Sequence, residues 1–295
     1  TNTGIPSNSA KDWKFTLRPG STFDDGKAIT CEDVRYGASR VFAQDVLPDG
    51  PTYLIGWLDT GKETYPGPFK ATAAQQAAYD KAVECSADHR TITFHLKQSV
   101  GDFNYLLTYP VVSPVQKAKD NGDKYDLFPQ STGPYKIKEN NKSRLLLVRN
   151  PAWKASSDPI RTPYPDQVVL EFGLDQELMD QIILSNSIPG AMNFDGPLPT
   201  NLKKFFEGTT FKGGKYNKDT AFVGYIAFNV KKMPCLQIRK AMYFARNAKA
   251  IVDYKGGPTY NGGYVQSVVS PLNTVDYAPN GEWGPANPNW KPEGN

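Results

Sequence analysis

The first clear pattern in the chain is an alternation of apolar and polar side chains. In the stretch "WKFTLR", residues 13–18, every second side chain is apolar, which is the period of a strand with one buried face. Pro19 and Gly20 end this strand, and "DDG" at 24–26 predicts a second turn. Thr30 followed by Asp33 matches a capping box ahead of an amphipathic helix. The segment therefore predicts a strand, two turns and a helix in quick succession.

The same two periods predict further elements along the chain. Period-two patterns predict a hairpin from 82–85 and 91–97, a second hairpin from 134–138 and 144–148, and strands over 167–172 and 222–230. Helical spacing predicts short helices over 102–107, after an Asp175 cap, and from Pro234 onward. Residues 47–70 are rich in Gly, Pro and aromatics and predict an irregular surface loop. The part after Lys255 is rich in Gly, Pro and Asn and shows no convincing core element.

Composition and charge narrow the class of protein. The 295 residues are 39% hydrophobic, which is too apolar for a disordered chain, and no apolar run approaches the roughly 18 residues of a membrane helix. The net charge is +4, but Lys and Arg are interleaved with Asp and Glu, which disfavours a nucleic-acid partner. The first ten residues contain neither a basic nor an apolar leader region and therefore say nothing directly about export.

The three cysteines are Cys31, Cys85 and Cys235. Cys31 lies at the start of a predicted helix and Cys85 at the end of a predicted strand, so they could pair in an oxidising compartment. The alternative is that all three are small buried thiols. Composition and spacing leave both interpretations open, and Cys235 has no obvious partner.

Catalytic chemistry has little support in the sequence. The only two histidines are His89 in a predicted turn and His95 on the polar face of a strand. No HExxH, GxSxG, Walker loop or strand-following GxGxxG occurs. Aromatic residues make up 12% of the chain. Most aromatic rings fill cores, but those in loops can also line a ligand cleft.

Five motifs, in order along the chain, carry a family resemblance. They are "WKFTLRPGSTFDDGKAITCEDVRYGASRVF", "DHRTITFHLKQ", "STGPYKIKE" with "LLLVRNPAW", "YIAFNVKKMP" and "IRKAMYFARNAKAIV". In sequence and spacing they resemble family 5 of the extracellular solute-binding proteins, the dipeptide and oligopeptide receptors of ABC importers. The cysteine positions and "GPTY" resemble the actinobacterial branch of that family.

The resemblance implies a mixed α and β fold of the type II periplasmic-binding-protein class, with mixed sheets. Residues 1–117 would form the smaller subdomain of the first lobe, residues 118–230 its main part with one hinge-crossing strand, and residues 231–295 the beginning of the second lobe. Family members are considerably longer, so we expect the first strands and most of the second lobe to be missing from this chain.

The resemblance also implies ligand-contacting residues. Tyr53 and Tyr225 match positions where peptide-binding relatives use aromatic contacts. Alternation along the predicted crossing strand places Ala227 and Asn229 on the same face as Tyr225. Ala227 departs from receptors that have an acidic residue there, so the preferred length and charge of a peptide stay open. The alternative for each tyrosine is a purely structural ring.

The function expected from this resemblance is a non-enzymatic receptor that captures oligopeptides, or a related small solute, and delivers them to a membrane permease. We expect no cofactor, no metal site and no catalytic residue, a Cys31–Cys85 disulfide, a monomer, and an extracellular protein that is lipid-anchored in its full-length form. The alternatives are a sugar-binding receptor of the same family, a secreted glycoside hydrolase that uses paired carboxylates, and an interaction domain without a cleft.

Overall fold

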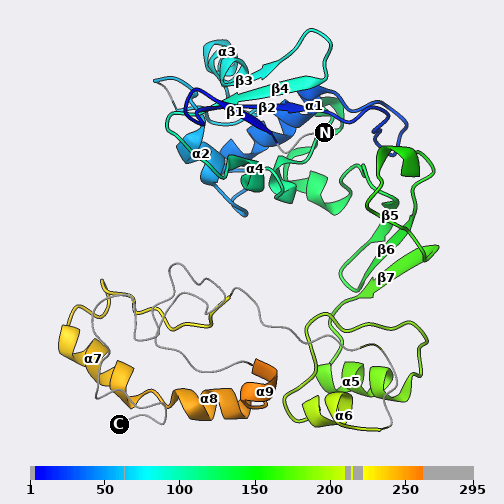
Figure 1. Ribbon diagram of the computed structural model, residues 1–295, viewed down its shortest axis with the longest axis vertical. Helices are drawn as coiled ribbons and strands as arrows, with labels where there is room; N and C mark the ends of the chain where they lie inside the picture. Colours follow the sequence, from blue (N-terminus) through cyan, green and yellow to red (C-terminus); the bar gives the residue numbers. More distant parts are fainter. Residues whose placement is uncertain (1–3, 63, 210–213, 215–221, 262–295) are drawn as a thin grey trace. The chain divides into compact units, whose positions relative to one another are not determined.

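The computed structural model describes residues 4–62, 64–209, 214 and 222–261. The chain divides into two compact units, Thr1–Phe172 and Gly173–Asn295, which Figure 1 colours blue to green and green to orange. This boundary falls inside the predicted segment 118–230. The assignment of 1–117, 118–230 and 231–295 to parts of two lobes stays a prediction.

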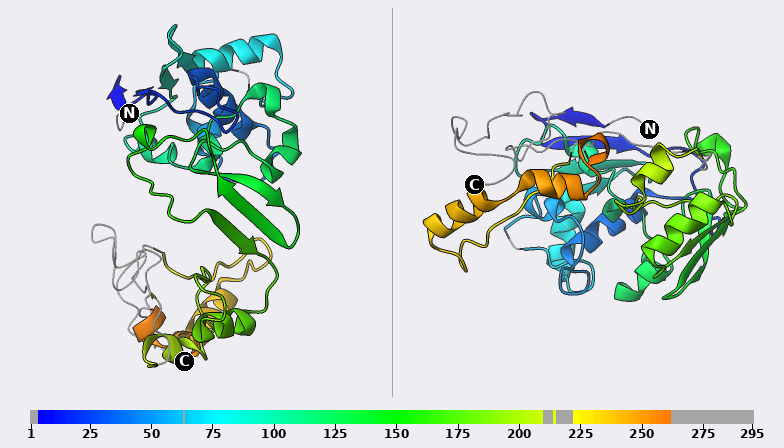
Figure 2. Two further views of the ribbon diagram at one scale, coloured as in Figure 1. Left: turned by 90° about the vertical axis from the view of Figure 1, so that its right-hand side faces the viewer. Right: turned by 90° about the horizontal axis from the view of Figure 1, so that it is seen from below.

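The first unit contains two sheets with short helices around them (Figures 1 and 2). Its elements in chain order are β1 (Ile5–Ser7), β2 (Asp12–Thr16), α1 (Cys31–Ser39), η1 (Arg40–Phe42), α2 (Tyr53–Trp57), α3 (Ala73–Ala82), β3 (Val83–Cys85), β4 (Thr91–His95), α4 (Phe103–Leu106), η2 (Pro110–Val112), η3 (Lys117–Lys119), η4 (Gly122–Leu127), β5 (Tyr135–Asn140), β6 (Arg144–Arg149), η5 (Ala155–Ser157) and β7 (Gln167–Glu171).

The four-stranded sheet has the order β1-β2-β4-β3, and each neighbouring pair is antiparallel. Trp13 lies opposite Phe94, and Phe15 lies opposite Ile92. Trp13, Ile92 and Phe94 are buried. Lys14, which lies between Trp13 and Phe15 in the chain, is exposed. The predicted strand at 13–18 and the hairpin of 82–85 with 91–97 are therefore confirmed, with strand ends that differ by one or two residues.

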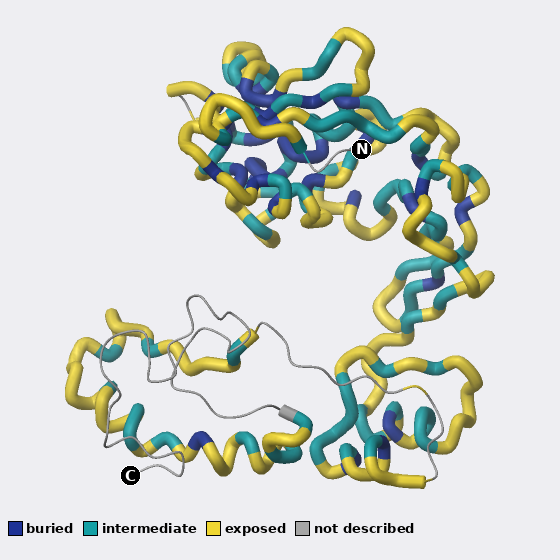
Figure 3. Tube along the Cα trace, viewed as in Figure 1, coloured by how far each residue is buried: buried dark blue, intermediate teal, exposed yellow. Residues whose placement is uncertain are grey.

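Helix α1 begins as the capping box predicts. The Thr30 backbone N–H donates to Asp33 Oδ2 at 2.9 Å, and Thr30 Oγ1 accepts from the Asp33 N–H at 3.4 Å. These two bonds satisfy groups that a helix start otherwise leaves unpaired. α1 packs against β3 and β4, the same two strands that α3 contacts. Figure 3 shows that buried positions of the first unit gather where these elements meet.

An aromatic cluster joins the helices on this core. The Tyr65 and Tyr79 rings stack with centroids 4.4 Å apart, and Phe42 meets both edge-on. The Tyr79 hydroxyl donates to the Arg35 carbonyl of α1 at 2.9 Å. Burial raises the pKa of Tyr65 to about 12, so its hydroxyl stays a neutral donor and bonds Gln76 Oε1 at 2.9 Å.

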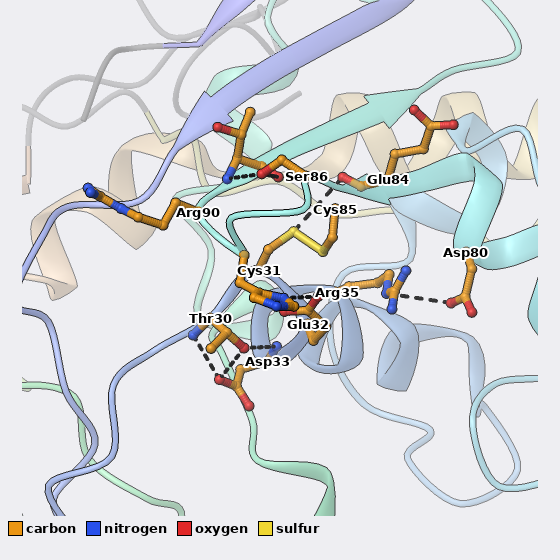
Figure 4. The surroundings of a disulfide bond; sticks show 12 residues. Thr30, Cys31, Glu32, Asp33, Arg35, Asp80, Glu84, Cys85, Ser86 and Arg90 are labelled. Atoms are coloured by element: carbon orange, nitrogen blue, oxygen red, sulfur yellow. Dashed lines mark hydrogen bonds and ion pairs between the residues drawn. A yellow bond between two sulfur atoms is a disulfide. The ribbon is translucent and has the colours of Figure 1, made fainter.

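The predicted disulfide is present between Cys31 at the start of α1 and Cys85 at the end of β3, with Cα atoms 5.7 Å apart (Figure 4). Cys31 is fully buried, and its backbone N–H donates to the His89 carbonyl in the β3–β4 turn at 2.8 Å. The bond therefore joins α1 to the β3–β4 hairpin. Cys235 is free and exposed.

The second sheet of this unit has the order β5-β6-β7 and is also antiparallel (Figure 1). A register shift between Ile137 and Glu139 marks a bulge in β5. These strands confirm the predicted hairpin of 134–138 with 144–148 and the predicted strand at 167–172. All strand pairs in the described residues are antiparallel, so the expected mixed sheets do not occur in this part of the chain.

The connection between β6 and β7 is organised around Asp158, which is 7% exposed. Its Oδ2 accepts from Arg161 Nε at 2.5 Å and from Trp153 Nε1 at 3.2 Å. Desolvation opposes ionisation of this carboxyl, but the hydrogen bonds from Arg161 and Trp153 and the arginine charge outweigh it, so the pKa of Asp158 is lowered.

The second unit contains α5 (Gln176–Ser185), α6 (Leu202–Phe206), α7 (Leu236–Ala245), α8 (Ala248–Tyr254) and α9 (Pro258–Asn261). Asp175 caps α5 as predicted, since its carboxylate accepts from the N–H groups of Glu177 and Leu178. Asp180 of the same helix is fully buried and accepts from Asn201 Nδ2 at 2.8 Å and from the Leu198 N–H at 2.9 Å. These bonds fasten the segment before α6 to α5.

Two local predictions are wrong. Residues 222–230 are not a strand, since no ladder pairs them in the described part of the chain. The loop at 47–70 contains the helix α2.

The helix expected from Pro234 is confirmed as α7, although it begins at Leu236 with Cys235 as its cap. No core element was expected after Lys255. Within that part, the short helix α9 (Pro258–Asn261) forms, and residues 262–295 lie outside the described residues.

Among the residues that the structure describes, no helix combines the length and apolar character needed to cross a bilayer.

Removing the disulfide is expected to destabilise the first unit. The bond closes a separation of 54 residues, worth about 4 kcal/mol in the chain-entropy account. The double variant Cys31→Ala and Cys85→Ala should therefore lose about that much free energy of unfolding in urea titrations. Cys235→Ala, at an exposed free thiol, is the matched control and should unfold like the wild type. A double variant that also matches the wild type contradicts this role.

The Asp158 contacts predict an acid-dependent contribution to stability. Because its folded pKa is lowered, the contribution is complete above the unfolded value, near pH 4, and is lost as pH falls through the folded pKa. Asp158→Asn should therefore be less stable than the wild type at pH 7, by about 1–3 kcal/mol, and the difference should shrink in acid. Asp166→Asn, at a side chain 90% exposed and paired with Arg149, is the control, with little expected change. A difference that stays constant with pH rules this account out.

Candidate functional site

Tyr53 begins the short helix α2, and its side chain faces solvent. The residue is 52% exposed, and its ring stacks on Trp57 with centroids 5.5 Å apart and planes inclined by 27°. The two residues are four apart, which places them one above the other on one face of the helix. Together they form a flat aromatic surface, called here the α2 aromatic pair.

The opposite side of α2 fixes this pair to the core. Leu54 and Leu58 are 1% and 0% exposed. Leu58 also forms a bridge with Leu96 beyond β4, and the Trp57 carbonyl accepts from the Lys97 N–H at 2.8 Å. The exposed Tyr53 ring and the partly buried Trp57 ring therefore stand on a helix that Leu54 and Leu58 anchor in the core, which is the arrangement expected of a preformed contact surface.

Two more exposed tyrosines lie on α4 and just after it. Tyr105 is 72% exposed and Tyr109 is 46% exposed, whereas Phe103 and Leu106 of α4 are buried. Phe103 and Leu106 belong to the same hydrophobic core as Leu54. The first unit therefore has aromatic rings exposed on two helices that share one core.

The other predicted contact residues lie in the second unit. Tyr225 is 71% exposed, and Ala227 is exposed in the same irregular segment. Asn229 is exposed too, but its Oδ1 accepts from the N–H groups of Lys231 and Lys232, each at 3.1 Å. The Asn229 side chain therefore closes the turn that leads toward α7. Because 222–230 is not a strand, the alternation argument for one shared face does not hold here.

Tyr53 lies in one compact unit, and Tyr225, Ala227 and Asn229 lie in the other, so each group is described within its own unit. Ligand contact by any of these four residues stays a prediction. Trp57 was not expected as the partner of Tyr53. The two residues are four apart, so a predicted helix over α2 would have placed them on one face. Tyr105 and Tyr109 were not expected either, although the short helix at 102–107 could have indicated them.

Each of the two histidines lies against carboxylate side chains. His95 Nδ1 lies 2.7 Å from Asp12 Oδ1, and His95 Nε2 lies 3.4 Å from Glu84 Oε2. These three residues belong to the neighbouring strands β2, β4 and β3. His89 Nδ1 lies 2.8 Å from Glu32 Oε1. The two His95 contacts link neighbouring strands, and the His89 contact links the β3–β4 turn to α1. In the described ranges no cluster of His, Cys, Asp and Glu is arranged to hold a metal ion.

Because the Tyr53 ring lies at the surface and Leu54 lies in the core, we expect the two residues to contribute very differently to stability. Tyr53→Ala should change the free energy of unfolding by less than about 1 kcal/mol, because the ring is half exposed. Leu54→Ala should cost about 2–5 kcal/mol, because it leaves a cavity in the core. Urea unfolding followed by circular dichroism measures both. Equal costs for the two variants would mean that Tyr53 is a structural ring.

The amino-acid sequence matches a known protein family over most of its length. The family described as bacterial extracellular solute-binding proteins, family 5 Middle, matches residues 6–289. The periplasmic oligopeptide-binding protein OppA of Salmonella typhimurium is 30% identical over 152 residues, which cover 48% of this chain and 26% of the relative. The chain thus matches about a quarter of this curated relative's length.

Solved structures match over more of the chain. Clavulanic acid biosynthesis oligopeptide binding protein 2 is 30% identical, with a TM-score of 0.78 over 99% of this chain and 52% of its own. A periplasmic oligopeptide-binding protein from Borrelia burgdorferi gives a TM-score of 0.61 at 17% identity, over 85% of this chain and 48% of its own. These matches confirm the predicted fold class.

Proposed function

The chain belongs to the bacterial extracellular solute-binding proteins of family 5, and from this membership we propose that it binds oligopeptides as the receptor component of an ABC importer. The observation that carries the proposal is the likeness to an oligopeptide-binding protein at 30% identity over 99% of the chain. The chain spans 52% of that protein, so the proposal concerns the receptor of which these residues form a part.

The mechanism proposed is capture without chemical change. Binding between two lobes stabilises a closed state because the ligand makes contacts there that the open state lacks. In this account the α2 aromatic pair supplies a rigid apolar surface for peptide side chains. Ligand contact by Tyr225 is a separate proposal that concerns the second unit alone. Rings with a polar tip suit a peptide because they combine large apolar contact area with a hydrogen-bonding hydroxyl.

The proposed setting is outside the cytoplasmic membrane, where the Cys31–Cys85 bond persists. Delivery to a membrane permease and a lipid anchor belong to the same proposal. A sugar ligand is the second candidate, because exposed rings such as Tyr53 and Tyr105 can also stack on a sugar face.

Native mass spectrometry of the protein, expressed from its complete natural gene and purified without denaturation, tests the ligand class. Co-purified masses that fragment as peptides support the proposal, and a series spaced by hexose units replaces it with the sugar receptor. Turnover of a glycoside panel would overturn both proposals.

The contribution of Tyr53 is tested by calorimetric titration of the same protein with a peptide found in that experiment. Tyr53→Ala should weaken binding by roughly tenfold, because an aromatic contact contributes about 1–2 kcal/mol. Phe69→Ala is the matched control, since Phe69 is an aromatic residue of the same unit, 38% exposed, outside both α2 and α4. Equal affinity of the Tyr53 variant and the wild type would remove the α2 aromatic pair from the site.

A further inference from the structure

A pocket with both polar and apolar lining residues lies at the start of β5, in the first unit. It has a volume of about 520 Å³ and is lined by residues 131–135 and 161–163, within the size range of small-ligand sites. Residues 131–135 are the "STGPY" motif, which the proposed function does not use. The motif residues and the β6–β7 connection thus form the two walls of the pocket.

Buried hydrogen bonds hold the first wall. Asn150 is 4% exposed, its Nδ2 donates to the Gly133 carbonyl at 2.8 Å, and its backbone N–H donates to the Pro134 carbonyl at 2.8 Å. The Ser131 hydroxyl accepts from the Gly133 N–H at 3.2 Å and donates to the Tyr135 carbonyl. The wall is therefore preorganised.

Arg161 is oriented by contacts on two sides. Its Nε donates to Asp158, and its Nη1 lies where a side chain on residue 133 would be, 2.8 Å from the position of a Cβ there. Only glycine at 133 leaves room for the guanidinium to lie against the backbone in this way. Within the described part of the chain, neither Nη group of Arg161 has a protein hydrogen-bond partner, and the hydroxyls of Thr132 and Thr162 have none either.

We propose that this pocket binds a carboxylate group through Arg161. The two Nη groups form the end of a planar fork that matches the two oxygens of a carboxylate. Two threonine hydroxyls supply further donors, and Pro134, Tyr135 and Pro163 provide apolar surface for the rest of the ligand. The carboxylate belongs either to a small organic acid or to the C-terminus of a peptide. Because Asp158 offsets the arginine charge, the binding is weak, with a dissociation constant on the order of 1 mM.

Nitrogen-15 NMR of the arginine Nε–H signals tests the site, with N-acetylglycine as the carboxylate probe. N-acetylglycinamide is the matched probe without the charge, and chloride keeps the ionic strength constant. The Arg161 signal should shift and saturate with N-acetylglycine and stay in place with the amide. A signal that stays in place with both probes overturns the proposal, and so does tighter binding of inorganic phosphate.

Two variants and one control distinguish binding in the pocket from a general effect of positive charge. Arg161→Gln should weaken carboxylate binding by roughly tenfold or more, followed through backbone amide signals of residues 131–135. Gly133→Ala keeps the net charge but displaces the guanidinium, and it should cause a comparable loss even if Arg161→Gln folds poorly. Lys154→Gln removes a positive charge of the same β6–β7 connection, outside the pocket lining, and should leave binding unchanged. Equal losses in all three variants would overturn a specific site.

The source of the carboxylate is distinguished by a second titration. A short peptide with a free C-terminus should shift the same signals, whereas its C-terminal amide should not, if peptides use the pocket. A response to N-acetylglycine alone assigns the site to small organic acids. Either response supports a carboxylate site, whether or not the α2 aromatic pair binds peptides.

Discussion

The packing of helices onto the inner face of the four-stranded sheet is the constraint on which the first unit depends. Trp13, Ile92 and Phe94 are almost completely buried on that face, and each such side chain contributes about 1.5–3 kcal/mol relative to exposure. The Trp13 indole N–H also donates to the carbonyls of Ala10 and Val100, each at 3.1 Å. The largest ring of this sheet is thereby buried without an unpaired donor.

Both proposed binding features of this unit rest on buried groups. Tyr53 of the α2 aromatic pair is held at the surface because Leu54 and Leu58 occupy the core beneath it. The walls of the carboxylate pocket depend on Asn150 and Asp158, two buried polar residues whose side chains hydrogen-bond the surrounding loops. Buried polar groups with satisfied partners rigidify a region, and here they hold loops that have little regular structure of their own.

Sequence patterns predicted the helix starts correctly where the hydrogen bonds that form them join residues close in the chain. The Thr30 and Asp33 capping box and the Asp175 cap formed as predicted because the bonded groups are two or three residues apart. The capping box of Thr72 with Gln75 was available in the same way, but the helix α3 that it begins was not predicted. Pairing of Cys31 with Cys85 was left open by spacing alone, because only the packing of α1 on β3 determines whether the two residues meet.

Predictions failed where the outcome depends on distant partners. Residues 222–230 have strand-like alternation, but a strand requires a neighbour to complete its hydrogen bonds, and the described residues provide none. α2 is a five-residue helix, too short to be stable alone, so its presence in a Gly- and Pro-rich loop comes from the burial of Leu54. The Arg161 site could not be inferred either, since Gly133 and Arg161 are brought together only by the fold. These cases share a dependence on contacts that are remote in sequence.

The central claim is that α2, anchored by its buried leucines, presents Tyr53 to a peptide ligand. Hydrogen–deuterium exchange, measured with and without a mixed-sequence short-peptide library on the protein expressed from its complete gene, tests it most directly. The account predicts slower exchange in the fragment that covers Tyr53–Trp57 when peptides are present, with unchanged exchange in β6 and β7. Protection that appears elsewhere while that fragment exchanges at its unliganded rate would contradict the claim.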